Sequence, residues 1–158
     1  MIIKTGLGQD SHAFEETSGK PLILAGINFE HSLGLKGNSD ADVVLHSITN
    51  AISSITGRNI LGSVADKLAQ KGQKNSQKYL KIALIDLSLW KINHIAISIE
   101  CLKPKISPKI ELMRENISKI CNISITDVGI TATSGEGLSA FGRGEGIQVI
   151  SILTVSKL

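Results

Sequence analysis

Apolar residues recur along the chain at two spacings, and each spacing predicts one kind of element. In residues 39–55 they recur at every third or fourth position and form one apolar stripe, which predicts an amphipathic helix. The same spacing predicts helices over residues 76–90 and 106–121, and Pro108 is tolerated in the first turn of the latter. Residues 63–75 are polar and rich in lysine, and we expect them to form an irregular connection.

Shorter apolar runs, several of them alternating with polar residues, predict strands. They lie at residues 2–8, 22–24, 27–29, 94–101, 128–133 and 147–155. The second and third runs are joined by Ala25-Gly26, and we expect them to form a short hairpin. The chain has no internal repeat and no linker long enough to divide it. Mixed strands with interposed helices therefore predict one α/β sandwich, a single domain over residues 1–158.

The composition is that of a folded protein with an aliphatic core. Of its 158 residues, 42% are hydrophobic but only 3% are aromatic, and the mean hydropathy is +0.16. A formal net charge of +3 suits an anionic small molecule. The lysines are scattered and form no basic stripe interleaved with aromatic residues, so we expect no nucleic-acid partner.

Cysteine usage and hydropathy bear on the compartment. Cys101 and Cys121 are far apart and form no C-x-x-C motif, which is typical of reduced cysteines in a cytosolic protein. The N-terminus runs directly into strand-like sequence without the apolar region of a signal peptide. The most apolar stretch, residues 82–102, is interrupted by Asp86 and Lys91, so we expect no membrane span and no membrane partner. These features predict a cytoplasmic protein.

An acid and an imidazole follow the first apolar run. Asp10 and His12 are two positions apart, and in an extended chain such residues point to the same face. The simpler interpretation is a polar exit from the strand, and a third ligand elsewhere would decide between the two. His31 and His94 have no comparable partners in the sequence, and we expect them to be ordinary surface or strand-end residues.

A third candidate ligand lies on the first predicted helix. At helical spacing, Ser39, Asp42 and His46 share a face roughly opposite the apolar stripe. Ser39 and Asp42 also match a capping box, which would explain Asp42 but not His46. One aspartate and two histidines, Asp10, His12 and His46, are a plausible set of protein ligands for a catalytic zinc with an open fourth position.

The glycine-rich segment before the last predicted strand carries a second candidate site. Thr133, Ser134 and Gly135 offer hydroxyls and backbone N–H groups to an anion. Glu136 has the oxygen ligands that a hard divalent cation prefers, and Arg143 is a fork donor suited to phosphate. An unspecialised glycine-rich hairpin is the alternative. A metal site in the same chain favours phosphate chemistry.

Four stretches are similar to the motifs of one known family. G-x-G-x-D-x-H occupies residues 6–12, S-D-A-D-V-V-L-H-S-I-T-N-A-I occupies 39–52, P-K-x-x-P occupies 104–108, and T-S-G-E-G-L-S-A-F-G-R-G-E-G occupies 133–146. Almost from end to end, the chain resembles the 2-C-methyl-D-erythritol 2,4-cyclodiphosphate synthase family of the non-mevalonate isoprenoid pathway. The second motif is the most specific of the four.

The resemblance implies a fold, an assembly and a reaction. The fold is an α+β sandwich with a mixed four-stranded main sheet, helices on one face and a small hairpin, and the assembly is a homotrimer with active sites between subunits. The enzyme is a phosphorus–oxygen lyase. The 2-phosphate of 4-diphosphocytidyl-2-C-methyl-D-erythritol 2-phosphate attacks the β-phosphate, and CMP leaves. Zn²⁺ on Asp10, His12 and His46 would hold one phosphate, and Mg²⁺ or Mn²⁺ near Glu136 would bridge the diphosphate.

The resemblance also implies roles for single residues. Asn38 and Ser134 take catalytic positions, Lys105 faces a phosphate, residues 101–107 form the cytidine pocket, and residues 60–62 contact ribose mainly through backbone. The substrate-binding set implied in this way is Asp10, His12, Asn38, Ser39, Ile60, Leu61, Gly62, Cys101, Lys105, Ile106, Ser107, Thr133, Ser134, Gly135, Glu136 and Arg143.

The chain departs from the family's pattern in two places. Asn38 stands where the family usually has a histidine, and asparagine donates a hydrogen bond but cannot become cationic. Residues 58–66 keep only Gly62 of the usual ribose and flap segment. Two other functions therefore stay open: a metal-dependent phosphohydrolase, and a non-catalytic trimer that binds an isoprenoid diphosphate. The resemblance also implies a second site, in which Arg143, paired with Glu145, binds an isoprenoid diphosphate at the mouth of an apolar central cavity; an interface ion pair without a ligand is the alternative.

Overall fold

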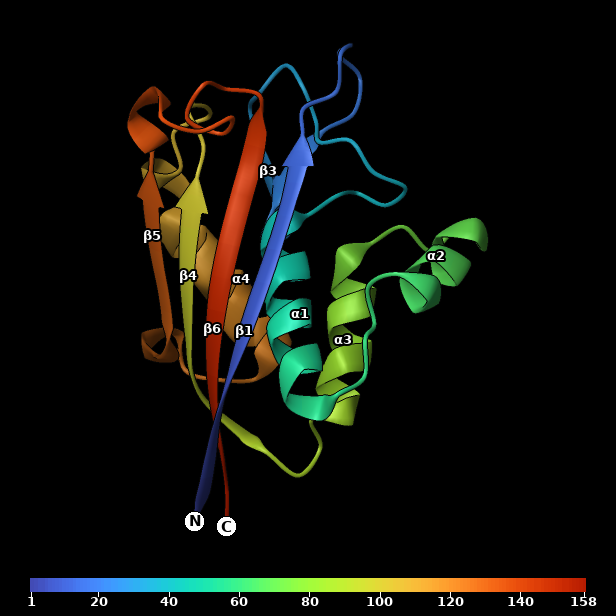
Figure 1. Ribbon diagram of the computed structural model, residues 1–158, viewed down its shortest axis with the longest axis vertical. Helices are drawn as coiled ribbons and strands as arrows, with labels where there is room; N and C mark the ends of the chain where they lie inside the picture. The colour runs from blue at the N-terminus through green and yellow to red at the C-terminus, as the bar shows by residue number, and fades with distance from the viewer.

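The computed structural model describes residues 1–158 and contains a four-stranded mixed sheet. Its strands are β1 (Ile2–Ala13), β4 (Lys91–Glu100), β5 (Val128–Thr133) and β6 (Gly146–Lys157), in the order β1-β6-β4-β5. β6 is antiparallel to both of its neighbours, and β4 is parallel to β5. The two edge strands, β1 and β5, therefore run in the same direction and end at the same end of the sheet (Figure 1).

The helices are α1 (Val43–Thr56), α2 (Ser63–Gln70), α3 (Ser76–Asp86) and α4 (Ile110–Cys121). Two of them, α1 and α4, cover one face of this sheet, α3 packs against α1, and α2 lies beyond α3 (Figure 1). Single 3-10 turns occur at Ser107–Lys109, Ile125–Asp127 and Gly135–Gly137. The hairpin of β2 (Leu22–Leu24) and β3 (Ile27–Phe29) forms a separate two-stranded sheet. The predicted α+β architecture is confirmed. No helix is long and apolar enough to cross a membrane.

The two faces of the sheet differ in their surroundings. On β6, Val149, Ser151 and Leu153 are completely buried beneath the helices, whereas the alternate residues Ile150 and Ile152 are exposed. This alternation follows from the period of two in a strand. The uncovered face is apolar, and a shallow hollow of about 330 Å³ lies on it over β4, β5 and β6.

Two glycines bring α1 unusually close to β1. A Cβ atom at Gly8 would overlap the carbonyl oxygen of Ser47, and one at Gly6 would overlap the carbonyl oxygen of Ala51. The strand therefore presents bare backbone to the helix. This close approach places His46 on α1 within reach of Asp10 on β1.

Several predicted boundaries are wrong, and one predicted connection is a helix. Residues 63–75, expected to form an irregular connection, contain α2. Val64, Ala65 and Leu68 lie on one face of this helix and pack against the core. Helix α1 begins at Val43 rather than at residue 39, and α3 ends at Asp86 rather than at residue 90.

Strand β1 is longer than predicted. It continues through the polar residues to Ala13, which pairs with Gly146 of β6. Asp10 and His12 consequently lie within the strand and not at its exit.

Candidate metal centre and phosphate-binding turn

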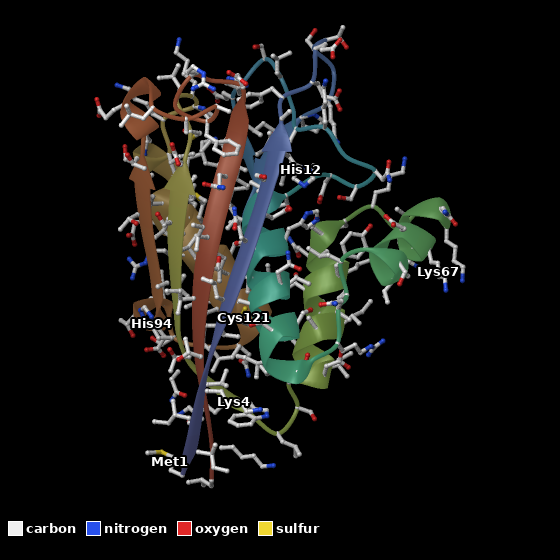
Figure 2. The ribbon with its side chains drawn as sticks, viewed as in Figure 1. Met1, Lys4, His12, Lys67, His94 and Cys121 are labelled. Carbon is white, nitrogen blue, oxygen red and sulfur yellow. The ribbon has the colours of Figure 1, made fainter.

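Asp10, His12 and His46 converge between β1 and α1. Asp10 and His12 project to the same face of the strand, as the sequence predicts, and His46 approaches from the first turn of α1 with 7% of its surface exposed. Asp10 Oδ2 is 3.0 Å from His12 Nε2 and 2.9 Å from His46 Nδ1. The three ligand atoms lie within 4.8 Å of one another. Figure 2 shows His12 near the C-terminal end of β1, beside the helices.

The chemistry of these side chains fits a divalent metal ion. Partial burial acts to raise the pKa of Asp10, but its contacts with His12 and His46 outweigh that effect and lower the pKa to about 2. The carboxylate is therefore ionised at neutral pH. His12 Nε2 is buried, and although it lies 3.0 Å from Asp10 Oδ2 it makes no hydrogen bond of acceptable geometry. Imidazole nitrogens and an ionised carboxylate oxygen are ligands that Zn²⁺ binds, and here all three lie close together.

Asp42 is a structural residue and not a ligand. It is the N-cap of α1, and its completely buried carboxylate accepts hydrogen bonds from the backbone N–H groups of Leu45, Ala25 and Gly26 at 3.1, 2.9 and 2.6 Å. Burial raises its pKa to about 6. The predicted capping box with Ser39 does not form, because Ser39 precedes the helix and its hydroxyl accepts from the N–H of Ala41. Asp42 instead joins α1 to the β2–β3 hairpin.

A cavity of about 300 Å³ opens in front of the three ligands. The residues expected there from the sequence are Asp10, His12, Asn38, Ser39, His46, Leu61 and Gly62. The cavity is also lined by Ala65, Asp66, Ala69 and Tyr79, which sequence reasoning missed because they lie on α2 and α3. The helical spacing of Val64 and Leu68 is the signal that could have predicted α2, which carries three of them.

Ile60 lies behind this cavity. Its side chain is completely buried, its N–H donates to Ser53 Oγ, and its carbonyl accepts from the N–H of Ala65. Leu61 and Gly62 therefore line the cavity, and Ile60 does not.

A second cavity, of about 250 Å³, lies at the other edge of the sheet. It is lined by Cys101, Lys105, Ile106, Ser107, Thr133 and Ser134, together with Leu102, Pro104 and Ala132. All six of the first group are sequence-predicted site residues, and they come from two stretches, 101–107 and 133–134, that are separated in the sequence by α4. Burial raises the pKa of the Cys101 thiol to about 11, so this cysteine is a neutral part of the wall.

The glycine-rich turn is built from short local hydrogen bonds. Thr133 Oγ1 accepts from the N–H of Gly135 at 3.2 Å, and Ser134 Oγ donates to Glu136 Oε1 at 3.3 Å. Glu136 has a φ of 50°, in the left-handed region that a residue with a Cβ seldom adopts, and its side chain is exposed. Strained backbone of this kind is concentrated at functional sites. The expected ion pair between Arg143 and Glu145 is confirmed, with 3.0 Å between Nε and Oε1.

The two cavities do not meet within one chain. The metal ligands belong to the β1 edge, and the glycine-rich turn follows β5 at the opposite edge, with β6 and β4 between them. Neighbouring strands are about 4.8 Å apart, so three intervals separate the two edges by about 14 Å. No residue lines both cavities. Of the other two histidines, His31 stacks on Phe14, and His94 lies toward the other end of the sheet (Figure 2).

Comparison with known proteins identifies close relatives. Residues 3–156 match the model of the YgbB family. The chain is 52% identical to the 2-C-methyl-D-erythritol 2,4-cyclodiphosphate synthase of Chlamydia caviae, over 99% of this chain and 90% of that protein. It is 31% identical to the bifunctional IspDF of Campylobacter jejuni, with a TM-score of 0.90 over 99% of this chain and 43% of that protein. The IspF of Plasmodium falciparum, in a CDP complex, shares the fold at 24% identity, with a TM-score of 0.82 over 98% and 96% of the two chains.

Proposed function

The chain belongs to the YgbB family, and we propose that it catalyses the reaction of its cyclodiphosphate synthase relatives. The substrate would be 4-diphosphocytidyl-2-C-methyl-D-erythritol 2-phosphate. Its 2-phosphate oxygen forms a bond to the β-phosphorus, the bond from that phosphorus to the CMP oxygen breaks, and CMP leaves with the bonding electrons. The products are 2-C-methyl-D-erythritol 2,4-cyclodiphosphate and CMP, so the enzyme would be a phosphorus–oxygen lyase.

The convergence of Asp10, His12 and His46 is the observation that carries this proposal. Two imidazoles and one ionised carboxylate leave an open position for a phosphate oxygen. When bound, Zn²⁺ at these residues and Mg²⁺ or Mn²⁺ at Glu136 would neutralise the charge that develops on the phosphates. The exposed carboxylate of Glu136 matches the oxygen preference of the second cation.

The other residues would position the substrate. The attacking phosphate has a second pKa of about 6 and is largely ionised at neutral pH, so the reaction requires no general base. The chain must instead align the two phosphates and neutralise them. Thr133 and Ser134 would donate hydroxyl hydrogen bonds to the transferred phosphate, and Lys105 would contribute a positive charge in the same cavity.

A complete site would require two copies of the chain. The metal centre and the glycine-rich turn lie at opposite edges of one sheet, while the uncovered sheet face exposes Leu7, Ile150 and Ile152. An apolar face of this kind favours burial against other copies. A homotrimer packed through these faces would bring the β1 edge of one subunit beside the β5 edge of the next, with the cytidine bound in the cavity at Cys101–Ser107.

Product analysis tests the chemistry. Purified protein supplied with Zn²⁺ and Mg²⁺ should convert the substrate to the cyclic diphosphate and CMP, as followed by ³¹P NMR. Linear phosphate products with CMP would instead identify a phosphohydrolase. Bound substrate without turnover would indicate that Asn38, in place of histidine, has abolished catalysis.

Subunit mixing tests the shared site. His46→Ala and Glu136→Gln each impair one half of the site, so each alone should keep no more than about a tenth of wild-type activity. If the two variants are unfolded and refolded together, about one quarter of the sites in randomly assembled trimers should combine two intact halves. Recovery of about a quarter of wild-type activity supports the shared site, and no recovery in assembled mixed trimers contradicts it.

A further inference from the structure

A chain of hydrogen bonds lies behind His46, on the side of the ring away from Asp10. His46 Nε2 is 2.8 Å from Ser76 Oγ, and the Ser76 hydroxyl in turn contacts Asp40 Oδ1 at very short range. Asp40 Oδ2 also accepts from the backbone N–H of Ser76 at 3.1 Å. Ser76 is completely buried and is the first residue of α3, whereas Asp40 lies in the loop before α1.

The direction of each hydrogen bond in this chain follows from the donors available. An ionised carboxylate only accepts, so the single hydroxyl hydrogen of Ser76 points to Asp40. Ser76 Oγ must then accept from His46, which requires a hydrogen on Nε2. When a metal ion takes the place of the Nδ1–Asp10 hydrogen bond, the neutral imidazole that satisfies this chain has its lone pair on Nδ1, the atom that lies 2.9 Å from Asp10 Oδ2.

We propose that Asp40 and Ser76 are positioning residues that fix the tautomer and orientation of His46 for metal binding through Nδ1. The proposal rests on the metal centre of the proposed function. A metal-bound histidine commonly donates its second ring N–H to a carboxylate or a carbonyl. Here the Ser76 hydroxyl lies between the two: it accepts the hydrogen bond of His46 and donates its own to the carboxylate of Asp40.

The surrounding structure holds this chain in place. Asp40 Oδ1 also accepts from the N–H of Asp42, and the backbone N–H of Asp40 donates to the carbonyl of Lys74 at 2.8 Å. Asn75 caps α3 through the N–H of Gln77, which fixes the helix end that carries Ser76. These contacts join the start of α1 to the start of α3. The orientation of His46 consequently depends on a residue 30 positions away in the sequence.

Ser76→Ala is the direct test, and Ser47→Ala is its matched control. Ser47 is equally buried and adjacent to His46, but its hydroxyl pairs with Ser151 and has no connection with the imidazole. Zinc affinity is measured by competition with a chromogenic chelator. We expect Ser76→Ala to bind zinc about 10–100-fold more weakly than wild type, which is the usual loss for such outer partners. Asp40→Asn should weaken binding in the same direction, and Ser47→Ala should stay within about twofold.

A spectroscopic measurement separates positioning from a general loss of structure. In zinc-loaded wild type, the His46 Nε2–H should give a slowly exchanging downfield proton resonance, because Ser76 accepts its hydrogen bond. This resonance should persist in Ser47→Ala and disappear in Ser76→Ala. Wild-type zinc affinity in Ser76→Ala, or an equal loss in Ser47→Ala, would overturn the positioning role alone. A wild-type protein that binds no zinc would overturn the metal centre, and the positioning role with it.

Discussion

The two halves of the candidate site are built in opposite ways. At the β1 edge, the metal centre consists of side chains on regular elements, and His46 is almost completely buried and supported from behind by Ser76 and Asp40. At the β5 edge, the glycine-rich turn consists mainly of exposed residues with short or no side chains. A metal ion requires ligands fixed on a rigid scaffold, whereas a phosphate can be bound by backbone N–H groups and hydroxyls along a turn.

The turn obtains its shape from glycine rather than from a core. Gly135 and Gly137 have φ angles of 75° and 72°, on either side of the strained Glu136. Ser139 donates a short hydrogen bond to Glu100 at the end of β4, which fastens the turn to the sheet. Substitutions at the metal centre should therefore act through lost ligands and lost packing. Substitutions of the exposed side chains in the turn should act through the substrate alone, whereas a side chain at Gly135 would overlap Glu100 and distort the turn.

The largest expected effect is at the metal centre. His46→Ala removes one of three ligands, so we expect loss of stoichiometric zinc and a fall in turnover greater than the roughly 10–100-fold that outer partners cost. Metal analysis of the purified variant and a CMP-release assay measure the two effects. A His46→Ala protein that retains one zinc per subunit would contradict the ligand assignment.

A smaller and different effect is expected in the turn. Glu136→Gln keeps the size of the side chain but removes the charge that a second cation requires, so turnover should fall by about 10–100-fold and lose its response to magnesium. Zinc content and melting temperature should equal those of wild type, since the side chain is exposed. Unchanged turnover with a normal magnesium response would remove Glu136 from the site.

The smallest expected effect concerns Arg143. We expect an isoprenoid diphosphate to bind near Arg143 in the central cavity of a trimer, where Arg143 and Glu145 form an exposed ion pair in each chain. Geranyl or farnesyl diphosphate at about 100 times its Kd should raise the melting temperature of wild type by about 5 °C. The rise should be absent in Arg143→Ala. An equal rise in both proteins, or none in either, would leave only the ion pair.

The sequence predicts this fold well where the apolar residues of an element recur at the spacing typical of a helix or a strand. The α1 stripe and the hairpin at Ala25-Gly26 are confirmed for that reason. The predicted β1 is too short because residues 9–12 are polar, and the strand continues there through pairing with β6. The sequence does not predict α2, because a helix of eight residues with few apolar positions shows only a weak hydrophobic periodicity. In the structure, packing of Val64 and Leu68 against the core stabilises this helix.

The candidate site was predictable in its parts but not in its arrangement. Asp10 and His12 share a face in any extended chain, and the structure adds His46 to them as expected. Ser76 and Asp40 were not found because no local period relates a loop before α1 to the first residue of α3. The separation of the two half-sites follows from strand order, which a list of strands does not determine.

The bare backbone of β1 at Gly6 and Gly8 links metal occupancy to folding. Glycine within a strand lowers stability by roughly 0.5–1 kcal/mol relative to alanine. The close approach of α1 that these glycines permit assembles the three ligands only in the folded chain, since Asp10 and His46 are 36 positions apart. An ion that binds only the folded chain adds about 2.7 kcal/mol to the free energy of unfolding at 100 times its Kd. With a metal ion at the three ligands, the close approach at Gly6 and Gly8 would therefore make the folding equilibrium depend on the free metal concentration.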